Sequence, residues 1–175
     1  MKKAVFQWQL FGFALTSFLG TILHFLYEWT NGSTIAALVS GVNESTWEHM
    51  KLLFVPMFFY SLIQSPFFRE RTDYWCIKLK GMLIGLILIP VIFYNYNGVV
   101  GKSPDFINIA IFFISAAVTY FYEWKQFEKE QIRCKHPKLS FVIICVIMVM
   151  FVVFTFAAPG LEIFKDPISE TYGIS

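Results

Sequence analysis

Five ionisable side chains that could bind a ligand are concentrated in one short stretch of this sequence. They are His24, Glu28, Glu44, Glu48 and His49. His24 and Glu28 are four residues apart, as are Glu44 and Glu48, so each pair shares one face if its segment is helical. Imidazole nitrogens and carboxylate oxygens bind divalent cations, and in transporters they relay protons. The pattern therefore predicts a site that binds or translocates a small solute or an ion.

The spacing of these residues matches no known zinc motif. His-Glu-x-x-His is absent, and the inverted form, His-x-x-Glu-His, would need a histidine in place of Ser45. We therefore assign no metal ligands from the sequence. A membrane-embedded, metal-dependent hydrolase that uses the same groups is an alternative function. A second alternative is a structural or partner subunit without site chemistry, because Ser45-x-x-Glu48 is also a capping box.

The composition places these residues in a membrane protein. Hydrophobic residues make up 57% of the 175-residue chain and charged residues only 15%, whereas soluble domains average about 25% charged residues. The formal net charge is +2, and no basic run is interleaved with aromatic residues in a polar segment, as a nucleic-acid-binding face requires. The expected partners are the lipid bilayer and a small solute or ion, and nucleic acid is excluded.

Five apolar runs are long enough to span a bilayer, which takes about 20 residues. The predicted spans are 4–29, 46–66, 76–96, 104–124 and 139–159. No ten-residue alternation of apolar and polar positions indicates barrel strands. All five tryptophans lie near predicted helix ends, where indole rings settle at the membrane interface. We expect one all-α domain over 1–175, a five-helix transmembrane bundle in which Gly81 and Gly85 allow close helix contact.

The connection between the first two spans has a distinct character. Segment 33–42 is apolar but too short to cross a bilayer, which predicts a re-entrant or interfacial segment. For the polar groups to meet, the first two spans must be neighbours and this connection must fold back over their ends. We then expect His24 to face inward, with a Glu or His of the second span within about 6 Å, where charges couple.

The distribution of positive charge predicts the orientation of the chain. Eleven of the fourteen Lys and Arg residues fall on one side of a five-span topology, and such residues accumulate in cytoplasmic loops. The chain is therefore expected in a cell membrane, with its N-terminus in the cytoplasm and its C-terminus outside. Cys76, Cys134 and Cys145 form no Cys-x-x-Cys pair, and we expect them to be unpaired.

Two segments resemble a known family. Leu23-His24, Tyr27-Glu28-Trp29 and Asn43-Glu44-Ser45-x-Trp47-Glu48-His49 are similar to a family of small bacterial integral membrane proteins classed only as a domain of unknown function. The ending Phe164-Lys-Asp166-Pro-Ile…Tyr172-Gly173-Ile174 resembles the way its members end. The resemblance covers essentially the whole chain. It implies a compact multi-span membrane protein and carries no assigned activity or catalytic residue.

Overall fold

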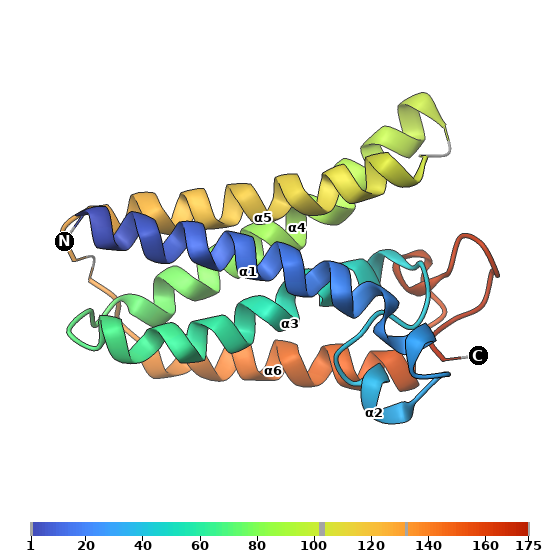
Figure 1. Ribbon diagram of the computed structural model, residues 1–175, viewed down its shortest axis with the longest axis horizontal. Coiled ribbons are helices and arrows are strands. Elements are labelled where there is room, and N and C mark those ends of the chain that lie inside the picture. The colour runs from blue at the N-terminus through green and yellow to red at the C-terminus, as the bar shows by residue number, and fades with distance from the viewer. Residues whose placement is uncertain (1, 102–103, 132, 175) are drawn as a thin grey trace.

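Five long helices run between the two ends of the molecule in a computed structural model that describes residues 2–101, 104–131 and 133–174 (Figure 1). They are α1 (Lys2–Trp29), α3 (Thr46–Gln64), α4 (Tyr74–Val100), α5 (Asp105–Glu128) and α6 (Pro137–Phe156). Short pieces join or follow them, namely α2 (Thr34–Ala37), η1 (Ser65–Phe68) and η2 (Glu162–Phe164). All five long helices are long and apolar enough to cross a membrane, which confirms the predicted bundle.

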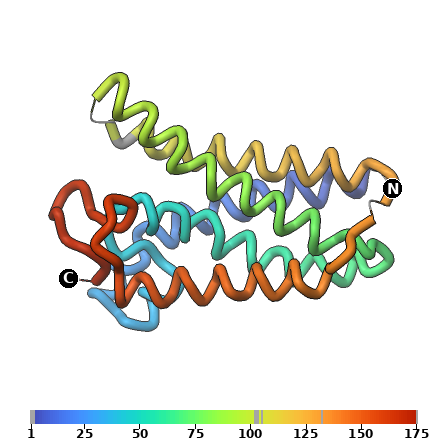
Figure 2. Tube along the Cα trace, turned by 180° about the vertical axis from the view of Figure 1, so that it is seen from behind, coloured from blue at the N-terminus to red at the C-terminus, as the bar shows by residue number. Residues whose placement is uncertain are grey.

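The helices pack around α3 and α4. Helix α3 contacts α1, α4 and α6, while α5 packs against α1 and α4. The two chain ends lie at opposite ends of the bundle, as an odd number of crossings requires (Figure 1). Toward the end that holds the C-terminus, the hairpin of α4 and α5 diverges from the other helices (Figure 2). We call this the C-terminal end and the other the N-terminal end.

The distribution of polarity is that of a membrane protein. Large apolar side chains are exposed on the outer faces of the helices, for example Phe18 (64% exposed) on α1 and Val149 (59%) on α6. Several polar side chains are instead fully buried between the helices, namely Thr16, Ser61, Gln64, Ser115 and Thr119. An apolar exterior around a partly polar interior is stable in lipid, where exposed hydrocarbon costs nothing and interior polar groups can pair.

The short segment predicted between the first two spans contains a single helical turn. Helix α2 covers only Thr34–Ala37, with Ala36 and Ala37 buried against the bundle. The Lys51 ammonium donates a hydrogen bond to the Ala37 carbonyl at 3.1 Å. This contact holds the connection down over the C-terminal end of the bundle.

Helix α4 extends beyond the predicted span 76–96 at both ends. The helix passes through Gly98 and ends at Val100, followed by the cap residue Gly101, whose φ of +100° no L side chain readily adopts. The predicted close contact at Gly81 and Gly85 is confirmed. A Cβ atom at Gly81 would lie 2.7 Å from the Glu123 carboxylate, and one at Gly85 would lie 2.5 Å from the Thr119 hydroxyl.

The prediction that the cysteines are unpaired is wrong for two of them. Cys76 and Cys134 form a disulfide across a sequence separation of 58 residues, while Cys145 is free. The bond joins the start of α4 to the connection before α6, a proximity that arises from helix packing and leaves no local sequence signal. It lies at the end that the charge distribution assigns to the cytoplasm, where disulfides are rare and usually transient or redox-sensing.

The orientation remains a prediction that cysteine labelling can test. In a background with all three native cysteines replaced by serine, a membrane-impermeant thiol reagent applied to intact cells should label a cysteine at Ser169. It should not label a cysteine at Glu130, because Lys and Arg accumulate at that end. Both positions are exposed. The reverse labelling pattern would overturn the orientation and would place the Cys76–Cys134 bond outside the cell.

Candidate functional site

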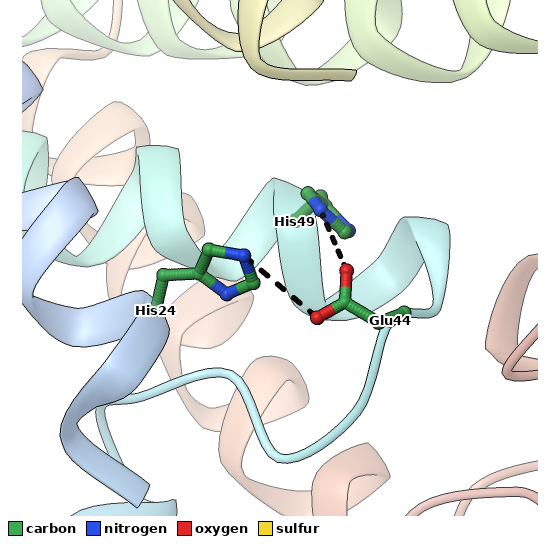
Figure 3. A group of neighbouring side chains, drawn as sticks. All are labelled: His24, Glu44 and His49. Carbon is green, nitrogen blue, oxygen red and sulfur yellow. Dashed lines mark ion pairs between the residues drawn. The ribbon is translucent and has the colours of Figure 1, made fainter. Parts of the chain in front are cut away.

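Three of the five residues singled out in the sequence meet at the C-terminal end of the bundle (Figure 3). His24 comes from the last turns of α1, Glu44 from the connection before α3, and His49 from the first turn of α3. The Glu44 carboxylate lies between the two rings, 3.7 Å from His24 Nε2 and 3.5 Å from His49 Nε2. One ligand atom from each of the three residues can be chosen so that all lie within 4.8 Å of one another.

Local structure fixes the orientation of His49. Its Nδ1 lies 3.0 Å from the Ser45 carbonyl oxygen one turn earlier. A carbonyl oxygen can only accept, so Nδ1 carries the proton. In the neutral ring the lone pair is then on Nε2, the nitrogen that faces Glu44. Histidine ligands of metal ions are held in the same way, with the other ring N–H donating to a carbonyl or carboxylate.

The contact between His49 and Glu44 places two hydrogen-bond acceptors face to face. The Nε2 lone pair of neutral His49 and the Glu44 carboxylate are both electron-rich, so a proton, a water molecule or a metal ion can bridge them. The distances from Nε2 of His49 and of His24 to the two different oxygens of the Glu44 carboxylate, 3.5 and 3.7 Å, exceed the 2.7–2.9 Å typical of a charge-assisted hydrogen bond. Ligand atoms that each lie about 2.0–2.1 Å from a tetrahedral zinc ion are roughly 3.3–3.4 Å apart. Because the three ligand atoms lie within 4.8 Å of one another, a shared tetrahedral ion would require the side chains to move closer together.

The connection that carries Glu44 is fixed on both sides. The Asn43 side-chain oxygen accepts from the Ser45 N–H at 3.0 Å, and its amide donates to the Gly173 carbonyl at 3.0 Å. Ser45 caps α3 by accepting from the Glu48 N–H at 3.3 Å. The chain ending returns to the bundle, where the Ile174 N–H donates to the Thr155 carbonyl. Because these contacts hold both neighbours of Glu44, Asn43 and Ser45, they fix the backbone position of Glu44 without a bound ligand.

Glu48 points away from the three residues and into the bundle. Its carboxylate forms a buried ion pair with Lys51 and accepts a hydrogen bond from the Thr155 hydroxyl of α6 at 2.8 Å. Lys51 is fully buried and also donates to the Thr155 hydroxyl oxygen at 2.7 Å. Only half of the predicted capping box forms, because the Ser45 N–H donates to Asn43 Oδ1 while the Glu48 carboxylate accepts from the Val42 N–H at 3.3 Å. Glu48 therefore stabilises the junction of α3, α6 and the connection.

Glu28 also lies outside the group. It is exposed near the end of α1. The group consists of His24 of α1 together with Glu44 and His49 around the start of α3 (Figure 3). Glu28 and Glu48 were included in the predicted site, but the fold does not bring them to His24, Glu44 and His49. Whether the remaining three bind a ligand stays a prediction.

His49 lines two cavities. One, of about 150 Å³, lies between α3 and the diverging α4–α5 hairpin, and is lined by Glu44, Thr46, His49, Asn97 and Ile168 among others. The other, of about 210 Å³, is lined by His24, Thr21, His49 and Phe113 among others. The His24, Glu44 and His49 side chains are 30%, 38% and 19% exposed. An ion or a small molecule can therefore reach the three residues without unfolding the bundle.

A second charged group, near the N-terminal end, was not found by sequence reasoning. Lys78 of α4 donates to the Glu123 carboxylate of α5 at 2.6 Å, and both side chains are at most 2% exposed. The ammonium also lies 5.6–5.9 Å from the ring centroids of Tyr60, Tyr74, Tyr120 and Phe127. The partners are 45 residues apart, so only the packing of α4 on α5 reveals the pair.

The chain matches a family across almost its entire length. Residues 1–174 match the family described as "Family of unknown function (DUF6512)". Comparison with curated proteins and with solved structures finds no match. The match agrees with the resemblance seen in the sequence, and this family carries no assigned chemistry.

Proposed function

The chain belongs to this family of unknown function, and we propose that it is a membrane protein that binds a divalent transition-metal ion through His24, Glu44 and His49. The observation that carries the proposal is the arrangement of two imidazole nitrogens around one carboxylate at 3.5 and 3.7 Å. Two His and one Glu is a ligand set found at zinc sites that keep a fourth position open. The 150 Å³ cavity beside Glu44 and His49 leaves room for that position.

Zinc is the ion that this ligand set fits best. Imidazole nitrogens suit zinc and neighbouring transition metals, whereas magnesium and calcium prefer sites built from oxygen atoms alone. Closing the three ligand atoms from within 4.8 Å to zinc-binding distance takes only small side-chain rotations in residues that are partly exposed. Because the ligands must be deprotonated, binding releases protons and should weaken as the solution is made acidic.

The same geometry favours binding over hydrolysis and over translocation. A metal-dependent hydrolase needs a general base beside the open position, but of the two glutamates at the start of α3, Glu44 is a ligand and Glu48 is paired with Lys51. An open path for translocation would have to pass the layer below the site, where Leu52, Leu53 and Phe112 are buried. Binding at the C-terminal end is therefore the function that the site supports.

The proposal predicts a specific loss of zinc affinity. Equilibrium dialysis of detergent-purified, chelator-stripped protein should detect one zinc site per chain. His49→Ala and Glu44→Gln should each weaken binding by more than about 100-fold, since even residues that only orient a ligand contribute 10–100-fold.

The chain offers a matched control for each variant. His136 is an exposed histidine at the opposite end of the molecule, and Glu28 is an exposed glutamate outside the site. His136→Ala and Glu28→Gln should bind zinc like the unmodified protein. Unchanged affinity in His49→Ala, or an equal loss in Glu28→Gln and Glu44→Gln, would contradict the proposal.

A further inference from the structure

A groove at the N-terminal end of the bundle combines positive charge with an apolar wall. It has a volume of about 580 Å³ and lies where η1, the start of α4 and the start of α6 meet. Arg69, Arg71 and Lys138 line it together with the Ser65 and Thr72 hydroxyls. This end lies opposite His24, Glu44 and His49, so the groove is independent of the proposed metal site.

The three cations that line the groove differ in whether they are paired with other residues. Arg71 forms a two-point pair with Asp73, at 2.9 and 2.8 Å, and donates to the Phe127 and Lys129 carbonyls. Arg69 and Lys138 are exposed, and no ion pair joins either one to another residue in the part of the chain that the structure describes. Arg71 therefore organises the groove, while Arg69 and Lys138 present positive charge to whatever enters it.

The remaining wall continues onto the lipid-facing surface. Trp75 of α4 and Phe141 of α6 line the groove in contact with each other, with ring centroids 4.5 Å apart. Val142 completes this wall and is 51% exposed, and Leu139 beside it is 54% exposed. Both helices begin at the groove, so their apolar outer faces lead away from it into the membrane.

We propose that this groove binds an anionic phospholipid, with its phosphate at Arg69 and Lys138 and an acyl chain along Phe141 and Val142. A free anion would use the cations but not the apolar wall, and an uncharged detergent would use the wall but not the cations. Basic pockets between membrane helices at the cytoplasmic surface are known to hold anionic head groups. The predicted orientation places this end at that surface, where anionic lipids concentrate.

The expected result is a stabilisation that depends on both parts of the lipid. Detergent-purified protein is titrated with dioctanoyl phosphatidylglycerol, dioctanoyl phosphatidylcholine or inorganic phosphate while the midpoint of thermal unfolding is followed. A ligand that binds only the folded state raises this midpoint. Phosphatidylglycerol should raise it, and neither phosphatidylcholine nor phosphate alone should do so at the same concentration.

The variant Arg69→Gln/Lys138→Gln should bind phosphatidylglycerol about 30-fold more weakly, the loss expected for two cations near a membrane surface. Lys3→Gln/Lys80→Gln is the control, because it removes two exposed cations from the same end of the bundle outside the groove. Val142→Trp fills the apolar wall without changing charge and should also abolish the response, so the test survives if the charge variant does not fold. An equal response to phosphatidylcholine or phosphate, or an unchanged response in both groove variants, would overturn the proposal.

Discussion

Replacing Lys78 by methionine should lower the free energy of unfolding by about 3–5 kcal/mol, because it leaves the Glu123 carboxylate buried without its counter-ion. Both side chains are almost completely buried, and one Glu123 oxygen already has no hydrogen-bond donor within the described residues. The measurement is equilibrium unfolding of the purified protein in mixed detergent micelles.

The double variant Lys78→Met/Glu123→Met distinguishes a buried charge from lost packing. Removing both charges and keeping the volume should recover most of the loss, since hydrophobic residues often replace a buried ion pair without destabilisation. Lys125→Met is the control, because Lys125 forms a partly exposed pair with Glu128 at 3.4 Å, and pairs near the surface contribute about 1 kcal/mol or less. A Lys78→Met protein as stable as the Lys125→Met protein would show that Glu123 is not held as a buried carboxylate.

Replacing Gly85 by leucine should lower the unfolding temperature clearly, because the site has no room for a side chain. A Cβ atom there would lie 2.5 Å from the Thr119 hydroxyl and 2.9 Å from a Leu53 methyl, and the rest of the side chain would force α4 away from α3 and α5. Overpacking a tight contact costs about 1–3 kcal/mol or more, so we expect the loss to reach the upper end of this range. Thermal unfolding in detergent measures it.

Gly98 provides the matched control in the same helix. Nothing lies within 4 Å of a Cβ atom built there, and leucine is a better helix former than glycine. Gly98→Leu should therefore leave the unfolding temperature unchanged or raise it. If Gly85→Leu and Gly98→Leu unfold at the same temperature, α4 does not approach its neighbours through Gly85.

Structural features that depend on residues close together in the sequence could be predicted, whereas contacts between distant residues, which arise from helix packing, could not. Runs of apolar residues are uninterrupted over each span, so the five helices follow from composition and length. His24 and Glu44 could be expected to meet because a short connection joins the ends of adjacent spans. The Gly81–Gly85 spacing likewise indicated a close contact between helices.

The failures have equally specific causes. Glu48 and Glu44 share a spacing of four residues, but Glu44 precedes α3 and is not on its helical face, while Glu48 turns inward toward Lys51. A Glu and a Lys three residues apart are a recognisable local pair, and that signal favoured Lys51 over the cluster as the partner of Glu48. The Cys76–Cys134 and Lys78–Glu123 contacts join residues on separate elements, and a single sequence contains nothing that couples them.

The most direct test of the metal centre is X-ray absorption spectroscopy of the zinc-loaded protein in detergent. The structure predicts a shell of nitrogen and oxygen atoms only, at about 2.0–2.1 Å, with outer scattering from two imidazole rings. His49→Ala loaded with zinc at high concentration should lose the signal of one ring. A sulfur atom at about 2.3 Å would place the ion at a cysteine, and a shell without imidazole would leave His24, Glu44 and His49 without the role proposed for them.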